Sequence, residues 1–179
     1  SVSVGETQLA ADFIRAWRKR VPDMPFVIST TTTTGQALAL KKVPEDVPVI
    51  FCPIDFYPFV KTTAKLVNPK LVVIFETEIW PNLIGVPHAM GAKLALVNAR
   101  ISDNSYKGYR RFRAFIRPFL GKVNVICAQT DIDVERLSTI CPGVAIEPTG
   151  TMKFDQNVPG EIPELDVKSV LGDGEGPIL

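Results

Sequence analysis

Leu71–Asn82 reads LVVIFETEIWPN, a strand signal followed at once by two carboxylates. Its first five residues are apolar and three of them are β-branched, which is typical of a strand buried on both faces inside a parallel sheet. Ligands of open α/β sheets bind at the carboxyl ends of the strands, so Glu76 and Glu78 are candidate site residues. On spacing alone, Glu76 could instead cap or pair with a neighbouring helix while Glu78 is solvated.

The composition is that of an ordinary globular domain. The chain has 179 residues, 46% of them hydrophobic, which suits one domain and not a complete two-domain enzyme. The net charge of +1 argues against bulk nucleic-acid binding, so we expect no nucleic-acid partner. Three widely spaced cysteines without a CxxC pair signal neither a disulfide framework nor a zinc site, and we expect no metal. No apolar run approaches the roughly 20 residues of a membrane span.

The first residues have the pattern of a strand, a tight turn and an amphipathic helix. Ser1–Val4 is strand-like, Gly5 supplies the turn, and Thr7 is a suitable N-cap for a helix with apolar residues at helical spacing over residues 9–21. Glu6 would then lie just outside the helix, at the carboxyl end of the strand and facing a cleft. The alternative is a helix-end carboxylate that stabilises the macrodipole. A strand at the very start also suggests that the chain begins inside a longer gene product.

Strand-like and helix-like segments alternate along the rest of the chain. Further strands are expected at residues 26–29, 48–52, 93–97, 123–127 and 144–146. This alternation predicts an α/β fold with a Rossmann-like parallel sheet flanked by helices. No GxGxxG follows the first strand, so dinucleotide binding is poorly supported. Asp55 has the position of an N-cap for the next helix, and the threonines at 30–34 could hold an anion or simply cap a helix.

A basic segment lies at residues 106–122. It contains six basic residues and no acidic one, interleaved with aromatic side chains. Such a segment could lie on an anionic membrane surface or bind a phosphorylated ligand. The alternative is a surface helix with its aromatic residues in the core and its arginines in water. The arginines concerned are Arg110, Arg111, Arg113 and Arg117.

The composition changes after residue 156. Residues 1–156 form the predicted Rossmann-like domain. Residues 157–179 are rich in proline, glycine and acidic residues, so we expect a linker and the truncated start of a further domain. Gly172–Gly176 resembles a phosphate loop only superficially, because no strand precedes it and acidic residues stand where an anion would bind.

Several of these segments together resemble one family, the 3-deoxy-D-manno-octulosonic acid (Kdo) transferases of lipopolysaccharide synthesis. The order and spacing of the motifs match over about residues 1–155, and ETExWPN is quite specific. The matching segments are SVSVGET at 1–7, TTTG at 32–35, NPK at 68–70 running on to ETEIWPNL at 76–83, NARIS at 98–102 and GTMKFD at 150–155.

The resemblance implies a fold, a reaction and a position for this chain within the enzyme. The family transfers Kdo from CMP-Kdo to the lipid A precursor by inverting chemistry without an active-site metal, using two domains in a GT-B fold. This chain would be the N-terminal, acceptor-binding half. The donor CMP-Kdo would bind through a C-terminal domain missing from this chain, no cofactor is implied, and the half alone would be inactive. The enzyme would lie at the cytoplasmic face of the bacterial inner membrane, with its anchor absent here.

The resemblance also assigns roles to three residues. By motif, Glu6 takes the position of the general base that deprotonates the acceptor hydroxyl. Glu76 and Lys153 take positions assigned to stabilising the transition state. The basic segment gains interest, because the lipid A precursor is a bisphosphorylated lipid in an anionic membrane.

Two other functions stay open on the sequence. One is a non-catalytic Rossmann-like module that binds a nucleotide or a partner protein at the same strand ends, against which the missing phosphate fingerprint speaks. The other is a different GT-B transferase of envelope sugars, which only the motif match excludes, because fold alone does not separate such relatives.

Overall fold

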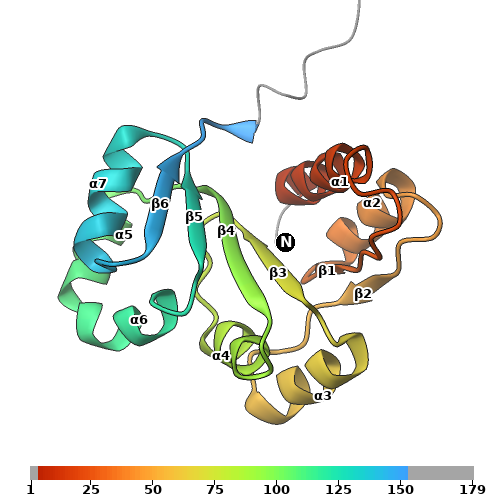
Figure 1. Cartoon of the computed structure of the whole chain (residues 1–179), viewed down its shortest axis with the longest axis horizontal. Coiled ribbons are helices and arrows are strands. Elements are labelled where there is room, and N and C mark those ends of the chain that lie inside the picture. Colours follow the sequence, from red (N-terminus) through yellow and green to blue (C-terminus); the bar gives the residue numbers. More distant parts are fainter. Residues whose placement is uncertain (1–3, 153–179) are drawn as a thin grey trace, which may run out of the picture.

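The computed structural model describes residues 4–152. Helices and strands alternate along this part of the chain (Figure 1). The helices are α1 (Val4–Arg18), α2 (Thr33–Lys42), α3 (Tyr57–Val67), α4 (Pro81–Ala89), α5 (Asp103–Arg111), α6 (Arg113–Leu120) and α7 (Asp131–Ile140). The strands are β1 (Ile28–Thr30), β2 (Val49–Phe51), β3 (Leu71–Phe75), β4 (Lys93–Ala99), β5 (Val125–Ala128) and β6 (Ala145–Pro148). The predicted linker at residues 157–179 lies outside the described residues.

All strand pairs within the described residues are parallel, and they form two sheets. The small sheet pairs β1 with β2, and the large sheet has the order β3-β4-β5-β6. Helices surround both sheets (Figure 1). The main core lies on the large sheet, where α4, α6 and α7 bury Ile84, Leu120 and Leu137 against β4 and β5. The prediction of a parallel α/β fold flanked by helices is confirmed.

The interior strands of the large sheet are β4 and β5, whereas β3 lies at its end. Six consecutive residues of β4 are buried, whereas Ile74 alone is buried in β3. The prediction that Leu71–Phe75 is buried on both faces inside a sheet is therefore wrong for the described residues. The reason is that β3 is an end strand of its sheet. A run of apolar residues indicates that a strand is buried, but it does not give the order of the strands in the sheet.

The N-terminal segment differs from its prediction. Helix α1 begins at Val4, so Val4 and Gly5 are helical and Glu6 lies inside the first turn, not in front of the helix. The predicted strand residues 1–3 lie outside the described residues. The helix starts early because its first turn packs against α2: a Cβ added at Gly35 would lie 3.3 Å from Thr7 Oγ1. Glu6 and Thr7 are buried in consequence.

Asp55 caps a different helix from the one expected. The N-cap of α3 is Phe56, which makes no side-chain capping bond. The Asp55 carboxylate instead accepts hydrogen bonds from the backbone N–H groups of Asn82 (3.3 Å) and Leu83 (2.9 Å), in the first turn of α4. Asn82 also donates its side-chain amide to the Asp55 carbonyl at 2.8 Å. Asp55 therefore ties the chain after β2 to the chain after β3.

We expect Asp55→Ala to lower the free energy of unfolding by about 1 kcal/mol or somewhat more, because two N–H groups at the start of α4 lose their acceptor. Urea denaturation followed by circular dichroism measures the change. Asp23→Ala, at an exposed position in the loop before β1, is the control and should change stability by less than roughly 0.5 kcal/mol. Equal values for the two variants would contradict the capping role.

Candidate functional site

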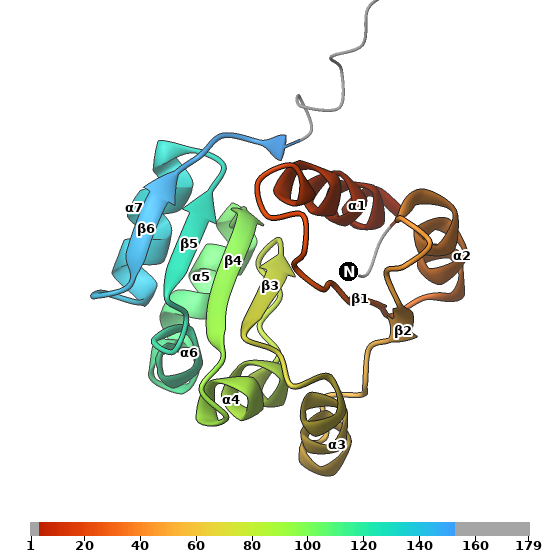
Figure 2. The ribbon, with the colours of Figure 1, turned by 45° about the vertical axis from the view of Figure 1, so that its right-hand side comes forward.

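Polar residues gather where the parallel strands end. β1 leads into Thr30, β3 into Glu76, β4 into Asn98 and β5 into Gln129. The strands are parallel within each sheet, so Thr30 lies at the carboxyl edge of the small sheet, and Glu76, Asn98 and Gln129 lie at the carboxyl edge of the large sheet. Such edges are where α/β proteins bind ligands. Figure 2 shows the arrowheads of β3, β4 and β5 at the same edge of the large sheet, which is the candidate site. The start of α1 lies by the carboxyl end of β1, because a Cβ at Gly35 would approach both Thr7 and Thr30.

Glu76 has an unusual backbone conformation. Its φ is +60°, in the left-handed region that side chains other than glycine rarely adopt. The conformation is held in place because Glu76 N donates to Val97 O at 2.9 Å, which continues the ladder between β3 and β4. Such strain, where the surroundings maintain it, concentrates at functional sites. The left-handed backbone of Glu76 is therefore evidence for a site residue that is independent of the sequence motif.

Asn98 is the second residue of this edge with a left-handed backbone, at φ +54°, and it is only 1% exposed. Its side-chain Oδ1 accepts from Met152 N at 3.2 Å, and its backbone carbonyl accepts from Gln129 Nε2 at 3.0 Å. Within the described residues its buried Nδ2 has no hydrogen-bond partner. The bond from Met152 to Asn98 thus ties the segment that follows β6 to the end of β4. Lys153 follows Met152 directly but lies outside the described residues, so its role is untested.

Glu6 lies in a buried polar cluster at the start of α1. Its side chain belongs to a residue only 6% exposed, and both Thr7 and Thr30 are fully buried nearby. Thr32 caps α2 by accepting from Gly35 N at 3.0 Å, which fits the capping interpretation of the threonine run. A Cβ at Gly35 would lie 2.9 Å from Oγ1 of Thr32, the cap of α2 itself, and 3.3 Å from Thr7 Oγ1 on α1, so glycine suits both the cap and the approach of the two helices. A carboxylate removed from water beside hydroxyl groups is suited to proton transfer.

Glu6 and Glu76 are carried by elements that contact each other. Phe13 of α1 packs edge-on against Phe75 of β3, with ring centroids 5.7 Å apart. Phe75 immediately precedes Glu76 in the sequence. This contact places the middle of α1 beside the end of β3.

The loop after β3 is tied to the loop after β4. Thr77 Oγ1 accepts from Arg100 N at 3.0 Å and also donates to the Arg100 carbonyl. Tyr109 of α5 donates its hydroxyl to the Thr77 carbonyl at 3.3 Å, and burial together with the nearby charge of Glu78 raises the pKa of Tyr109. Glu78 accepts from Trp80 Nε1 at 3.1 Å. The second carboxylate of the ETE motif thus has a structural partner in Trp80.

The four candidate arginines lie elsewhere, on α5 and α6. All four are exposed, and these two helices pack against α7 and α4. Phe112 and Phe115 lie among them and are 60% and 67% exposed, whereas Ile116 is buried. The alternative that the aromatic residues of this segment lie in the core and its arginines in water therefore holds for Tyr106, Tyr109 and Phe119, which pack against the core, but not for Phe112 and Phe115. The structure does not bring this basic and aromatic surface into the Glu6 cluster.

Two further observations bear on the chemistry. Residues 4–152 contain no group of three or more His, Cys, Asp or Glu side chains arranged to hold a metal ion. Within the same residues, no helix has the length and apolar character to cross a membrane.

Sequence reasoning missed how some residues organise the edge. Asp133 is buried and accepts from Ile101 N at 2.8 Å and from Thr130 Oγ1 at 2.6 Å, which holds the chain after β4 against α7. The special conformation of Asn98 was also missed. One signal could have found it: Asn98 is a lone amide inside the apolar run of β4.

Known proteins resemble this chain over most of its length. The family model for 3-deoxy-D-manno-octulosonic-acid transferase (kdotransferase) matches residues 1–156. A 3-deoxy-D-manno-octulosonic acid transferase of Rickettsia conorii is 29% identical over 180 residues, covering 100% of this chain and 38% of the relative. The transferase of the same name from Haemophilus influenzae is 28% identical over 163 residues, covering 90% and 38%.

A third relative has a broader name. A bifunctional glycosyltransferase/methyltransferase of Fusobacterium nucleatum is 32% identical over 155 residues, covering 85% of this chain and 24% of the relative. The chain therefore spans well under half the length of these three curated relatives. No solved structure matches it.

We expect Glu76→Gly to be about 1 kcal/mol more stable to unfolding than Glu76→Ala, because glycine alone relieves the left-handed strain. Both variants remove the carboxylate, so their difference isolates the backbone. Asn68→Gly is a matched control, since Asn68 has φ +46° at the end of α3 and lies outside the candidate site. Urea denaturation measures all three, and equal stability of the two Glu76 variants would refute stored strain at this position.

Proposed function

The chain belongs to the 3-deoxy-D-manno-octulosonic-acid transferase family, and on this premise we propose that it is the acceptor-binding part of a Kdo transferase. The whole enzyme would transfer Kdo from CMP-Kdo to the lipid A precursor in lipopolysaccharide synthesis. In this proposal residues 1–156 form the acceptor-binding domain, and the donor is held by a further domain. The observation that carries the proposal is the left-handed backbone of Glu76 within the ETE motif, and the burial of Glu6 in the first turn of α1 supports it.

Glu6 is proposed as the general base. The acceptor hydroxyl attacks the anomeric carbon of Kdo while its proton passes to the Glu6 carboxylate, and the bond to the CMP phosphate breaks. Such a single displacement inverts the configuration. Burial of Glu6 supports this role, because a carboxylate with little access to water holds a defined position for the incoming hydroxyl.

Glu76 and Lys153 are proposed to stabilise the charges that develop in this step. Glu76 would face the positive charge of an oxocarbenium-like carbon, and Lys153 the negative charge of the leaving CMP or of the sugar carboxylate. The bond between Asn98 Oδ1 and Met152 N supports a place for Lys153 at this edge, since it anchors the residue directly before it.

The basic and aromatic surface of α5 and α6 is proposed to contact the anionic membrane that carries the acceptor. Arg110, Arg111, Arg113 and Arg117 supply charge, and the exposed Phe112 and Phe115 supply apolar contact. In this proposal the enzyme works at the cytoplasmic face of the inner membrane. A surface that binds lipid headgroups and lies apart from the Glu6 cluster would orient the enzyme without entering its reaction.

We expect Glu6→Gln in the full-length enzyme to lower kcat by roughly 10²-fold to 10⁴-fold while the fold is kept, because glutamine cannot accept the proton. Release of CMP from CMP-Kdo in the presence of lipid A precursor measures turnover. Glu45→Gln is the matched control, at an exposed position between α2 and β2. Near-normal turnover of the Glu6 variant would refute the base assignment.

We expect glutamine at Arg110, Arg111, Arg113 and Arg117 together to weaken binding to anionic vesicles by roughly tenfold or more, since each basic residue near such a surface contributes about 1 kcal/mol. The acceptor KM should rise while kcat changes little. The control places glutamine at four other basic residues, which lie at the end of α2 or directly after α1: Lys19, Arg20, Lys41 and Lys42. Vesicle cosedimentation that falls equally in both variants would indicate a general charge effect and contradict the assigned surface.

A further inference from the structure

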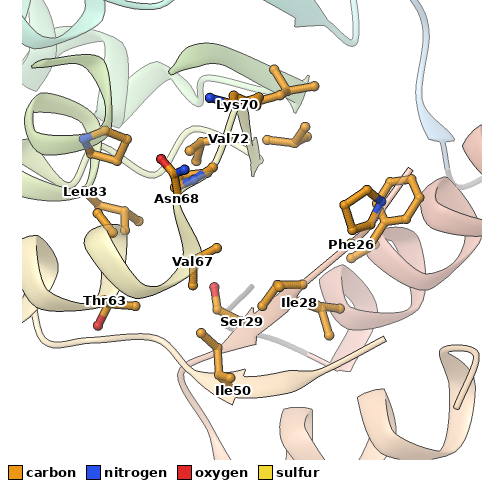
Figure 3. A pocket seen from close by; sticks show the side chains of 18 of the residues that line it. Phe26, Ile28, Ser29, Ile50, Thr63, Val67, Asn68, Lys70, Val72 and Leu83 are labelled. Carbon is orange, nitrogen blue, oxygen red and sulfur yellow. The ribbon is translucent and has the colours of Figure 1, made fainter. Parts of the chain in front are cut away.

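An apolar cavity between the two sheets carries almost no charge. It measures about 490 Å³ and is lined mainly by apolar side chains, among them Phe26, Ile28 and Val72 (Figure 3). Of the described residues that line it, Lys70 alone is charged. Lys70 precedes β3 and Glu76 follows it, so this charge lies at the end of the strand opposite to the candidate site. A cation for a charged substrate therefore has to come from another part of the chain.

The carboxyl ends of the described strands carry a single basic residue, Arg100. The segments that follow these strands are residues 31–32, 52–56, 76–80, 100–102, 129–130 and 149–152. Their acidic residues are Asp55, Glu76 and Glu78. Carboxylates repel the phosphate and carboxylate groups of the substrates in the proposed reaction. Arg100 is thus the one cation that the described part of these ends offers to an anionic substrate.

The backbone of Arg100 is held at both of its polar groups. Arg100 N donates to Thr77 Oγ1 at 3.0 Å, and the same hydroxyl donates to the Arg100 carbonyl. Thr77 is the central residue of the ETE motif. The next residue, Ile101, donates its N–H to Asp133 Oδ1 at 2.8 Å, and its carbonyl accepts from Arg136 Nη1 at 2.8 Å. Bonds from the loop after β3 and from α7 therefore fix the backbone of Arg100 relative to the ETE motif.

The side chain of Arg100, in contrast, is exposed and forms no ion pair within the described residues. Arg136, which contacts the residue after Arg100, is different because its guanidinium pairs with Asp103. A guanidinium has five N–H donors in a planar arrangement that matches phosphate and carboxylate oxygens. When the backbone beneath it is already fixed, binding an anion costs less conformational entropy. Arg100 is therefore preorganised to bind an oxyanion.

We propose that the guanidinium of Arg100 binds a phosphate of the acceptor. This inference rests on the proposed function, in which the chain is the acceptor-binding part and the donor is held by a further domain. Two parallel hydrogen bonds from a guanidinium fix the orientation of a phosphate as well as its position. Because Thr77 joins Arg100 to the ETE motif, the bound phosphate would be positioned relative to Glu76 by backbone bonds. Arg100 binds the acceptor in this scheme and takes no part in proton transfer.

The test combines a change in the full-length enzyme with a change in the acceptor. Arg100→Gln is assayed with the bisphosphorylated lipid A precursor and with two precursors that each lack one phosphate. We expect Arg100→Gln to raise the KM of the bisphosphorylated acceptor roughly 10-fold to 100-fold, while kcat and the KM of CMP-Kdo stay nearly unchanged. With the precursor that lacks the bound phosphate, variant and wild type should have equal acceptor KM, because the partner of Arg100 is already gone.

Two further variants sharpen the result. Arg100→Lys should recover only part of the lost affinity, since an ammonium cannot form two parallel bonds to phosphate. Lys93→Gln is the matched control, because Lys93 is an exposed basic residue at the amino end of β4, the strand whose carboxyl end leads to Arg100. It removes the same charge away from the candidate site and should leave the acceptor KM unchanged.

Several outcomes would overturn the assignment. They are an acceptor KM that Arg100→Gln does not change, a rise that is equal for all three acceptors, and an equal rise in the Lys93 control. A rise confined to the KM of CMP-Kdo would assign Arg100 to the phosphate or carboxylate of the donor and overturn it as well. Transfer by the wild type with an acceptor KM independent of Arg100 refutes this assignment alone. No transfer to the lipid A precursor by the wild type refutes the proposed function, and the assignment with it.

Discussion

The burial of β4 between two parallel neighbours is the constraint on which the candidate site depends. Six consecutive residues of this strand are buried, so its peptide groups must be satisfied by β3 on one side and β5 on the other. The same ladder continues past β3 through the bond from Glu76 N to Val97 O. The left-handed conformation of Glu76 thus follows directly on this ladder, and that of Asn98 coincides with the register shift between β4 and β5 at Leu96–Ala99.

Local strain of this kind persists only where several independent contacts impose it. The chain after β4 is held by Thr77 at Arg100 and by Asp133 at Ile101, and Asn98 is fixed by Met152. These bonds come from three other segments of the chain: the loop after β3, helix α7 and the residues after β6. Their convergence explains how a site residue can keep a conformation that its own side chain disfavours.

The sequence predicts the parts of this structure that depend on local patterns. Apolar runs located the strands, and a hydroxyl residue before a helix located the cap at Thr32. It could not rank β4 above β3 as the interior strand, because strand order is decided by contacts far apart in the chain. For the same reason Asp55 was assigned to the helix that follows it, while its acceptor oxygens serve α4, 27 and 28 residues further on. The geometry of a site is thus least visible in the sequence where distant segments build it.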